Sequence, residues 1–133
     1  MITGGCLCGR VRYEAHGEPL FSVICHCRDC QKASGAGAVP VMGISRSSFN
    51  VSGDPKSFVS IGGSQNKAIR HFCPDCGSLL FGTPEVLPHM VMLYVGSLDE
   101  PDLFKPDHAI FIRDRPAWAT MHAALVEYAT FPP

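Results

Sequence analysis

The sequence predicts a single, mainly β domain (residues 1–133) built from antiparallel sheets. Thirteen glycines and eleven prolines are spread along the chain and divide it into short segments, which is typical of β-proteins. Several segments are apolar runs of strand length, and the short turns between them favour antiparallel pairing of consecutive strands. With 46% hydrophobic and 17% charged residues, the composition is that of a globular chain. The length suits one hydrophobic core.

Residues 9–15 are the first predicted strand. Val11, Tyr13 and Ala15 fall on one face of this alternating segment and charged residues fall on the other, so we expect the strand to be half-buried. Residues 62–66, Gly-Gly-Ser-Gln-Asn, have the composition of a tight turn and predict a hairpin between two strands. Those two strands are residues 56–61 and 67–72, and further strands are predicted at residues 21–25, 38–44, 78–83, 89–95 and 108–113.

Two segments are candidates for helices. Residues 29–34 follow a cluster of cysteines and are stopped by Gly35, which predicts one short helix there. Residues 117–128 form the second candidate. Thr120, Val126 and Thr130 weaken this second prediction because β-branched residues lower helix propensity.

Charge and hydropathy exclude several classes of function. A net charge of −1 and a pI near 6.6 give no reason to expect a nucleic-acid partner or binding to an anionic membrane. The first residues have neither a basic segment nor an apolar one, so we expect no secretory signal. The longest apolar run, residues 90–95, is too short to span a bilayer. We therefore expect a cytoplasmic protein.

The seven cysteines point to metal binding. They fall into three tight groups, whereas cysteines that serve only as small apolar residues would be scattered along the strands. An odd number cannot pair completely within one chain, and the cytosol keeps thiols reduced. The three groups are Cys6 and Cys8, then Cys25, Cys27 and Cys30, then Cys73 and Cys76.

The first and third groups predict one closed, structural zinc site. Zinc prefers four tetrahedral ligands, and two cysteines in one tight turn can reach the same ion. Proline presets the backbone inside Cys73-Pro74-Asp75-Cys76-Gly77, and the glycine after the second cysteine suits a left-handed turn. Cys6-Leu7-Cys8-Gly9 has the same Cys-Gly ending. The four predicted ligands are Cys6, Cys8, Cys73 and Cys76, so zinc would cross-link the two turns.

The remaining group, Cys25, Cys27 and Cys30, lacks a fourth cysteine. Three protein ligands and an open position are typical of catalytic zinc, so we predict a second zinc ion here with these cysteines as the catalytic residues. Three alternatives stay open at this point: closure of the site by His26, His71 or Asp29, a redox group that forms a transient disulfide, and an iron–sulfur cluster with an external ligand. Arg28, Lys32 and Arg70 either offset the thiolate charge or are ordinary surface charges.

Three ordered sequence blocks resemble the glutathione-dependent formaldehyde-activating (Gfa) family, which shares a domain with centromere protein V. The resemblance extends over nearly the whole chain, because residues 108–111 and 116–118 also resemble the C-terminal part of the family. The blocks are Gly5-Cys6-Leu7-Cys8-Gly9-Arg10-Val11-Arg12-Tyr13, Cys25-His26-Cys27-Arg28-Asp29-Cys30-Gln31-Lys32-Ala33-Ser34-Gly35 and Phe72-Cys73-Pro74-Asp75-Cys76-Gly77-Ser78-Leu79-Leu80-Phe81.

The resemblance implies a β-tent arrangement of antiparallel sheets stapled by zinc. It implies two zinc ions per chain, a structural one on Cys6, Cys8, Cys73 and Cys76 and a second one on Cys25, Cys27 and Cys30. The implied activity is that of a carbon–sulfur lyase running in reverse, in which glutathione adds to formaldehyde and gives S-hydroxymethylglutathione. The alternative function is a non-catalytic, zinc-stapled β module that binds a protein partner.

Overall fold

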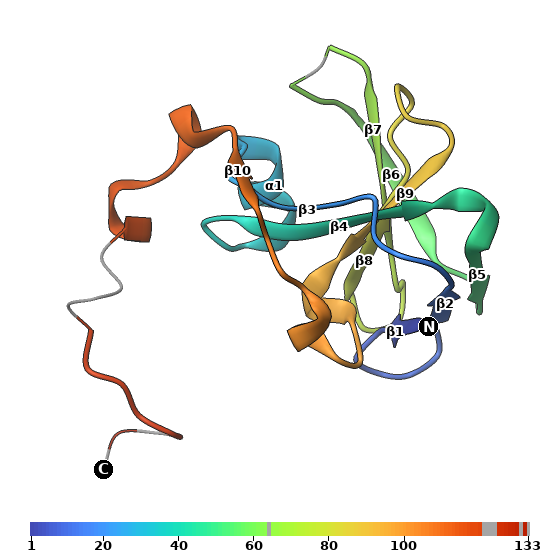
Figure 1. Cartoon of the computed structure of the whole chain (residues 1–133), viewed down its shortest axis with the longest axis horizontal. Coiled ribbons are helices and arrows are strands. Elements are labelled where there is room, and N and C mark those ends of the chain that lie inside the picture. The colour runs from blue at the N-terminus through green and yellow to red at the C-terminus, as the bar shows by residue number, and fades with distance from the viewer. Residues whose placement is uncertain (64, 121–124, 131, 133) are drawn as a thin grey trace.

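The computed structural model describes residues 1–63, 65–120, 125–130 and 132. This part of the chain is mainly β and contains one α-helix, α1 (Arg28–Ser34), as Figure 1 shows. None of its helical segments has the length and apolar character needed to cross a membrane. The strands in chain order are β1 (Ile2–Gly5), β2 (Arg12–Ala15), β3 (Phe21–Cys25), β4 (Val39–Ser45), β5 (Phe49–Ser52), β6 (Lys56–Ile61), β7 (Lys67–Phe72), β8 (Leu79–Gly82), β9 (Met90–Tyr94) and β10 (His108–Ile110).

The strands form two sheets. The smaller sheet has the order β1-β2-β5, and the larger has the order β10-β3-β4-β9-β8-β7-β6. Antiparallel pairing, predicted from the short turns, is confirmed for every pair but one. The exception is at one edge, where β10 pairs with β3 in parallel, so the predicted antiparallel pairing does not extend to this pair. The physical reason is the long connection from β9, which returns the chain to the far edge in the direction of β3.

The main core lies where residues of the two sheets pack together. On β2, Tyr13 and Ala15 are buried while Arg12 and Glu14 are exposed, which confirms the alternation predicted for this strand. A second, smaller cluster lies under β3 and β4 and includes Cys25 and Cys30. The largest fully buried side chains all belong to the main core and are Met42, Ile44, Leu80, Leu93, Val11, Val91 and Cys73.

Most predicted strands are present with ends shifted by one to three residues. The hairpin of β6 and β7 has the predicted bounds, and Gly62 N–H donates to Asn66 O at 2.9 Å; Ser64 of its turn lies outside the described residues. The strand predicted for residues 108–113 ends at Ile110, because Phe111 takes a left-handed conformation (φ 54°) and a 3-10 turn follows. The strands β1 and β5 were not predicted.

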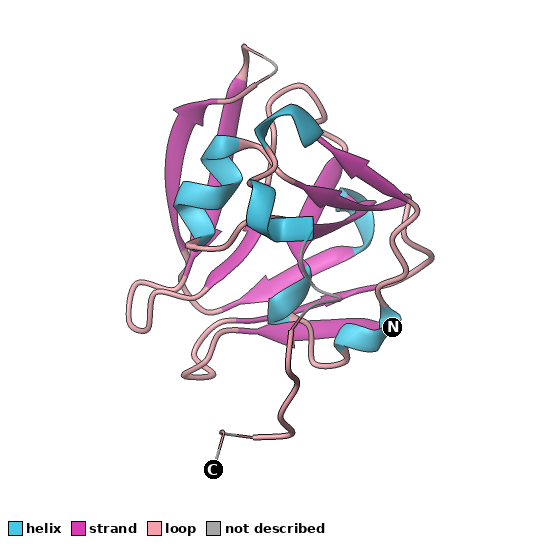
Figure 2. Cartoon of the chain, turned by 90° about the vertical axis from the view of Figure 1, so that its left-hand side faces the viewer, coloured by secondary structure: helices cyan, strands magenta, loops and turns pink. Residues whose placement is uncertain are grey.

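Of the two predicted helices, only the first forms as an α-helix. α1 begins after Cys27 and ends before Gly35, whose φ of 74° is the left-handed value that favours glycine. In the second candidate, a 3-10 turn covers Ala117–Thr120, residues 121–124 lie outside the described residues, and residues 125–128 are not helical. The prediction of one continuous helix is therefore wrong for the described part. In Figure 2, α1 and several 3-10 turns lie in front of the strands.

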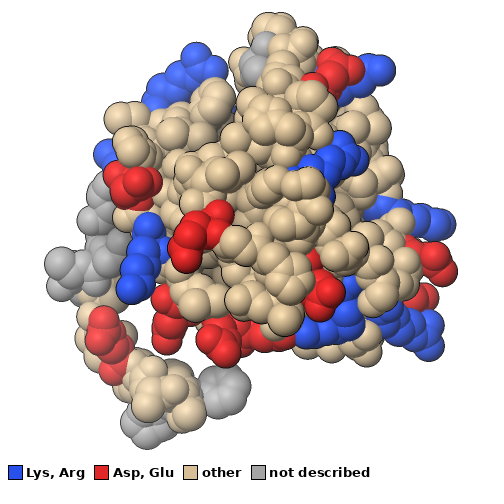
Figure 3. Space-filling view, turned by 45° about the vertical axis from the view of Figure 1, so that its right-hand side comes forward, with Lys and Arg blue, Asp and Glu red and all other residues tan. Residues whose placement is uncertain are grey.

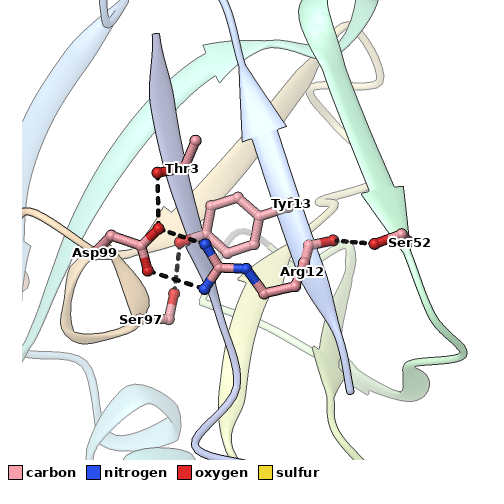
Figure 4. A network of polar contacts seen from close by, with 6 residues as sticks. All are labelled: Thr3, Arg12, Tyr13, Ser52, Ser97 and Asp99. Carbon is pink, nitrogen blue, oxygen red and sulfur yellow. Dashed lines mark hydrogen bonds and ion pairs between the residues drawn. The ribbon is translucent and has the colours of Figure 1, made fainter. Parts of the chain in front are cut away.

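A polar network fixes the segment after β9 to the small sheet (Figure 4). The carboxylate of Asp99 accepts hydrogen bonds from the Thr3 hydroxyl at 2.7 Å and from both terminal nitrogens of Arg12. Beside it, the hydroxyls of Tyr13 and Ser97 are 2.7 Å apart. On the face shown in Figure 3, acidic and basic side chains are interspersed, in keeping with the near-neutral net charge.

Candidate metal centres and the adjoining pocket

Four sulfur atoms from two distant turns meet beside the small sheet. The Sγ atoms of Cys6, Cys8, Cys73 and Cys76 all lie within 4.8 Å of one another. The Cys6–Cys8 and Cys8–Cys73 pairs are 3.5 and 3.7 Å apart. A tetrahedral zinc site with Zn–S bonds of about 2.3 Å needs sulfur separations of about 3.8 Å. The geometry and the donor atoms therefore fit one zinc ion.

The two turns differ in length by one residue but close in the same way. Gly9 and Gly77 adopt left-handed conformations, with φ of 81° and 77°. Gly9 N–H donates to Cys6 O at 3.1 Å, and Gly77 N–H donates to Cys73 O at 2.8 Å. In both turns the carbonyl of the first cysteine thus closes a loop that brings the second cysteine back beside it. A side chain at either glycine would be strained, which explains the Cys-Gly ending of both motifs.

Ser78 joins the two turns and is a residue that the analysis of the cysteine motifs missed. Its hydroxyl oxygen accepts a hydrogen bond from Leu7 N at 3.0 Å and lies 3.2 Å from Cys76 Sγ. Hydrogen bonds from the Ser78 hydroxyl and backbone lower the pKa of Cys76 to about 5, so this thiol is ionised readily. The signal available in the sequence was a hydroxyl residue two positions after a zinc-type cysteine.

The other three cysteines come from the end of β3 and the start of α1. Cys25 is the last residue of β3, Cys27 caps the helix by accepting from Cys30 N at 3.2 Å, and Cys30 lies in the first turn. Their Sγ atoms all lie within 4.8 Å of one another, and those of Cys25 and Cys30 are 3.6 Å apart. One short cap-and-helix segment thus presents three sulfurs at the spacing of one face of a tetrahedron.

Within the described residues, no histidine nitrogen or carboxylate oxygen lies within 4.8 Å of all three sulfurs. His71 is held elsewhere, since its Nε2 lies 2.8 Å from Thr83 Oγ1 and its ring stacks on Phe81. The buried His26 Nδ1 has no hydrogen-bond partner in the described part of the chain, and it is not a member of the cluster. This arrangement favours an open fourth position over closure by a side chain.

The three thiols shift one another's pKa values in opposite directions. Hydrogen bonds from Cys25 and Cys30 lower the pKa of Cys27. The hydrogen bond with Cys27 raises the pKa of Cys25, and hydrogen bonds with Cys25 and then Cys27 raise the pKa of Cys30. All three can be ionised together only if a cation balances them. A divalent metal ion fits this need, because thiolate is a preferred ligand of zinc.

Arg70 supplies a positive charge beside Cys30 of the cluster. Its Nη2 lies 3.9 Å from Cys30 Sγ, and its Nη1 donates to Ser60 Oγ at 3.3 Å. Burial acts to lower the pKa of Arg70, but the neighbouring Tyr94, Cys30 and Cys27 raise it by more. The net pKa is therefore raised, and the side chain is charged. Arg28 and Lys32 are exposed. Of the three predicted cations, Arg70 is therefore the one with a hydrogen bond to a sulfur of the cluster.

Gln31 holds the cysteine segment in place. Its buried amide Nε2 donates to the backbone carbonyls of His26 and Asp114, at 2.8 and 2.9 Å. The His26 N–H in turn donates to Ile110 O at 3.0 Å. These bonds attach the loop between Cys25 and Cys30 to β10 and the turn after it. The role of Gln31 was not foreseen, although it directly follows the third cysteine.

A pocket of about 340 Å³ opens onto this second cluster. Cys25, Cys30, Arg70 and Tyr94 contribute to its wall, and nine further residues complete it. Those nine are Phe21, Val23, Val41, Ala68, Ile69, Gly82, Pro84, Met92 and Ile110.

The register of the large sheet explains the shape of the pocket. Phe21, Gly43, Met92, Gly82 and Arg70 form one row across β3, β4, β9, β8 and β7. A Cβ atom on Gly43 would meet the Phe21 ring at 2.3 Å, so that ring lies over the glycine.

Tyr94 occupies the space over the other glycine of this row. Its hydroxyl would lie 3.1 Å from a Cβ atom on Gly82, and Gly82 is the register partner of Arg70. Burial raises the pKa of Tyr94 to about 12. The phenol is therefore protonated at neutral pH and lies near the guanidinium.

Comparisons with known proteins identify the family. The sequence profile of the family described as "Glutathione-dependent formaldehyde-activating enzyme" matches residues 1–114. The chain belongs to this family. A Halomonas elongata relative named "Putative glutathione-dependent formaldehyde-activating enzyme" is 26% identical over 140 residues, which cover 92% of this chain and 82% of the relative. A Rhodobacter sphaeroides protein of known crystal structure has a TM-score of 0.59 at 23% identity, covering 80% of this chain and 98% of that one, and thereby supports the fold.

Membership of the Gfa family confirms the resemblance found in the sequence and suggests glutathione-dependent formaldehyde activation. The mainly β fold is confirmed as well, and two cysteine clusters able to hold metal ions are present. The zinc roles of the individual cysteines stay predictions.

Proposed function

We propose that this Gfa-family chain is a zinc-dependent carbon–sulfur lyase-type enzyme, located in the cytoplasm. In this proposal the enzyme activates a small thiol, glutathione, for reversible addition to formaldehyde or another small aldehyde and yields an S-hydroxymethyl thiol adduct. The observation that carries the proposal is the cluster of Cys25, Cys27 and Cys30, which has no fourth protein ligand among the described residues and opens onto a pocket.

Two zinc ions per chain are part of the proposal. The ion on Cys6, Cys8, Cys73 and Cys76 would be structural, because four sulfurs complete its coordination. The ion held by Cys25, Cys27 and Cys30 would supply a Lewis acid that favours the thiolate form of an incoming thiol. A free thiol of pKa about 8.5 is only about 3% ionised at pH 7, so this help matters at physiological pH.

The residues around the pocket would then perform the addition. The Arg70 guanidinium, beside Cys30, favours a negatively charged sulfur in the site. As the thiolate sulfur bonds to the carbonyl carbon, the C=O π electrons move to oxygen. The Tyr94 hydroxyl, protonated at neutral pH, donates its proton to that oxygen and recovers a proton from water. The apolar walls exclude bulk water and hold thiol and aldehyde together, which contributes several kcal/mol in well-oriented reactions.

Cobalt-substituted protein tests the proposal directly. Thiolate-to-cobalt charge-transfer bands should strengthen when glutathione is added, because a fourth sulfur joins the site. S-methylglutathione, which lacks an ionisable thiol, is the matched control and should leave the bands unchanged. Exchange of formaldehyde with glutathione, followed by NMR, should run faster with the wild-type protein than with Cys27→Ser. A spectrum indifferent to glutathione, with exchange at the uncatalysed rate, would reject the proposal.

The alternative function, a non-catalytic module that binds a protein partner, is favoured by one specific observation. β6 is an edge strand of the large sheet, and its Phe58, Val59 and Ile61 side chains are exposed. Exposed apolar residues on an edge strand suit strand-to-strand pairing with another chain. Exchange of metal distinguishes the two functions, since an open second site should exchange zinc faster than the closed site, whereas a scaffold should hold both ions equally firmly.

A further inference from the structure

The pocket beside the second cysteine cluster is much larger than formaldehyde requires. Formaldehyde has two heavy atoms, whereas a volume of about 340 Å³ falls within the range of pockets that hold drug-sized or cofactor-sized ligands. Because Cys25 and Cys30 belong to its wall, whatever occupies the pocket lies beside these two thiols of the cluster.

The chemistry of the wall is nearly all apolar. Arg70 is its one charged side chain among the described residues. Its terminal nitrogens have Ser60 and Cys30 as partners, whereas its buried Nε has no hydrogen-bond partner in the described part of the chain. The remaining wall is made mostly of aliphatic and aromatic side chains from β3, β4, β7, β9 and β10. Burial of hydrocarbon against such a wall is energetically favourable, and burial of an unpaired charge against it is unfavourable.

Glutathione itself does not match this wall. The tripeptide carries two carboxylates and one ammonium group, and each would need a partner if it were buried. Arg70 alone cannot serve all three. The thiol end can reach the cluster while the charged ends stay in solvent, which leaves the pocket available to the second reactant.

We infer that the pocket binds the apolar side chain of the aldehyde, so that the preferred substrates are alkyl or aromatic aldehydes larger than formaldehyde. This inference rests on the proposed function and names its substrate class. The carbonyl carbon lies toward Cys25 and Cys30, the oxygen toward Tyr94, and the side chain along Phe21, Met92 and the remaining apolar wall. The product is a hemithioacetal: the thiol S–H bond breaks and its proton passes to water, one C–S bond forms, the C=O π bond opens, and the oxygen gains one proton.

A homologous series of aldehydes tests the inference. Butanal, pentanal, hexanal and heptanal have nearly equal intrinsic reactivity, so differences in kcat/KM with glutathione report contacts with the protein. Each buried methylene should raise kcat/KM about fourfold. Ala68→Leu adds apolar volume at the wall and should lower kcat/KM for heptanal far more than for butanal, so that the gain with chain length is lost. Ala36→Leu is the matched control, because Ala36 is exposed and outside this pocket.

A binding measurement separates failure of this inference from failure of the proposed function. Heptanamide is an unreactive analogue of heptanal, and the Met92 methyl group should report its binding through a change in carbon-13 chemical shift. Binding should weaken about fourfold for each methylene removed. Acceleration without any dependence on chain length would overturn the inference and keep the proposed function. Binding of heptanamide with no acceleration of any aldehyde would support the ligand class and reject the reaction. The absence of both would overturn both.

Discussion

Loss of the closed metal centre should cost far more stability than loss of the open one. The closed centre joins the β1–β2 turn to the β7–β8 turn, with 64 residues between Cys8 and Cys73. For a closed loop of about 65 residues, the loop-closure relation for a cross-link gives about 4 kcal/mol. The open centre closes a loop of about six residues, for which the same relation gives only about 2 kcal/mol.

The net stability of a domain is about 5–15 kcal/mol, so a metal ion at the closed centre would provide a large part of it. Cys8→Ser is the better variant to measure, because Cys8 is exposed, whereas Cys73→Ser would also bury a hydroxyl at a position with 0% exposure. Cys8→Ser should lower the free energy of unfolding by about 4 kcal/mol, and Cys73→Ser should lower it further and give insoluble or unfolded protein. Cys27→Ser should leave a folded protein with one zinc ion.

Urea unfolding at pH 7 in buffer without chelator, followed by far-ultraviolet circular dichroism, measures these differences. The zinc content of each variant is determined in parallel. If Cys27→Ser lowers the free energy of unfolding as much as Cys8→Ser does, both centres are structural, and the argument for an open catalytic site loses its basis.

Three further predictions concern composition, catalysis and pH. Protein prepared without chelator should contain two zinc ions per chain by metal analysis, and a brown, iron-rich preparation would contradict the assignment. Tyr94→Phe should lower kcat for thiol addition by about 10²-fold without a comparable change in KM; an unchanged kcat would remove Tyr94 from the mechanism. Hydrogen bonds from Arg12 and Thr3 lower the pKa of Asp99 to about 2. The ionised carboxylate therefore contributes its full stabilisation above about pH 4, and this contribution is lost as the pH falls toward 2. Asp99→Asn should therefore lower the free energy of unfolding by less than about 1 kcal/mol at pH 7, as for other exposed ion pairs, and this difference should shrink below pH 4 in urea titrations.

The sequence allowed the prediction of elements whose signals are local. Alternation marked β2, turn composition marked the hairpin of β6 and β7, and Gly35 marked the end of α1. β1 was missed because Ile2–Gly5 contains two glycines, which are depleted in strands. β5 was missed because Phe49–Ser52 has only four residues and lies between turn-type residues, Ser47 and Ser48 before it and Gly53 after it. The parallel pairing of β10 with β3 depends on a long connection and has no local signal.

The same distinction applies to the candidate site. The residues within each cysteine motif predicted which cysteines would lie together, because each motif forms a turn whose structure depends on neighbouring residues. The position of Arg70 could not be predicted in this way. In the sequence it is close to Cys73, but the register of β7 and its neighbours directs its guanidinium to Cys30 of the other cluster. The pocket is lined by residues of six strands, so local sequence patterns could not predict it either.

The parallel pairing of β10 with β3 has a consequence for the order of events during synthesis. Cys25, Cys27 and Cys30 leave the ribosome about 80 residues before Ile110, the register partner of Cys25. At translation rates of about 5–20 residues per second, this interval lasts about 4–16 s. Within it the three thiols already have the short-range spacing needed to bind a metal ion, while the pocket still lacks one wall. The second cysteine cluster of the nascent chain is therefore available to a metal ion before the adjoining pocket is complete.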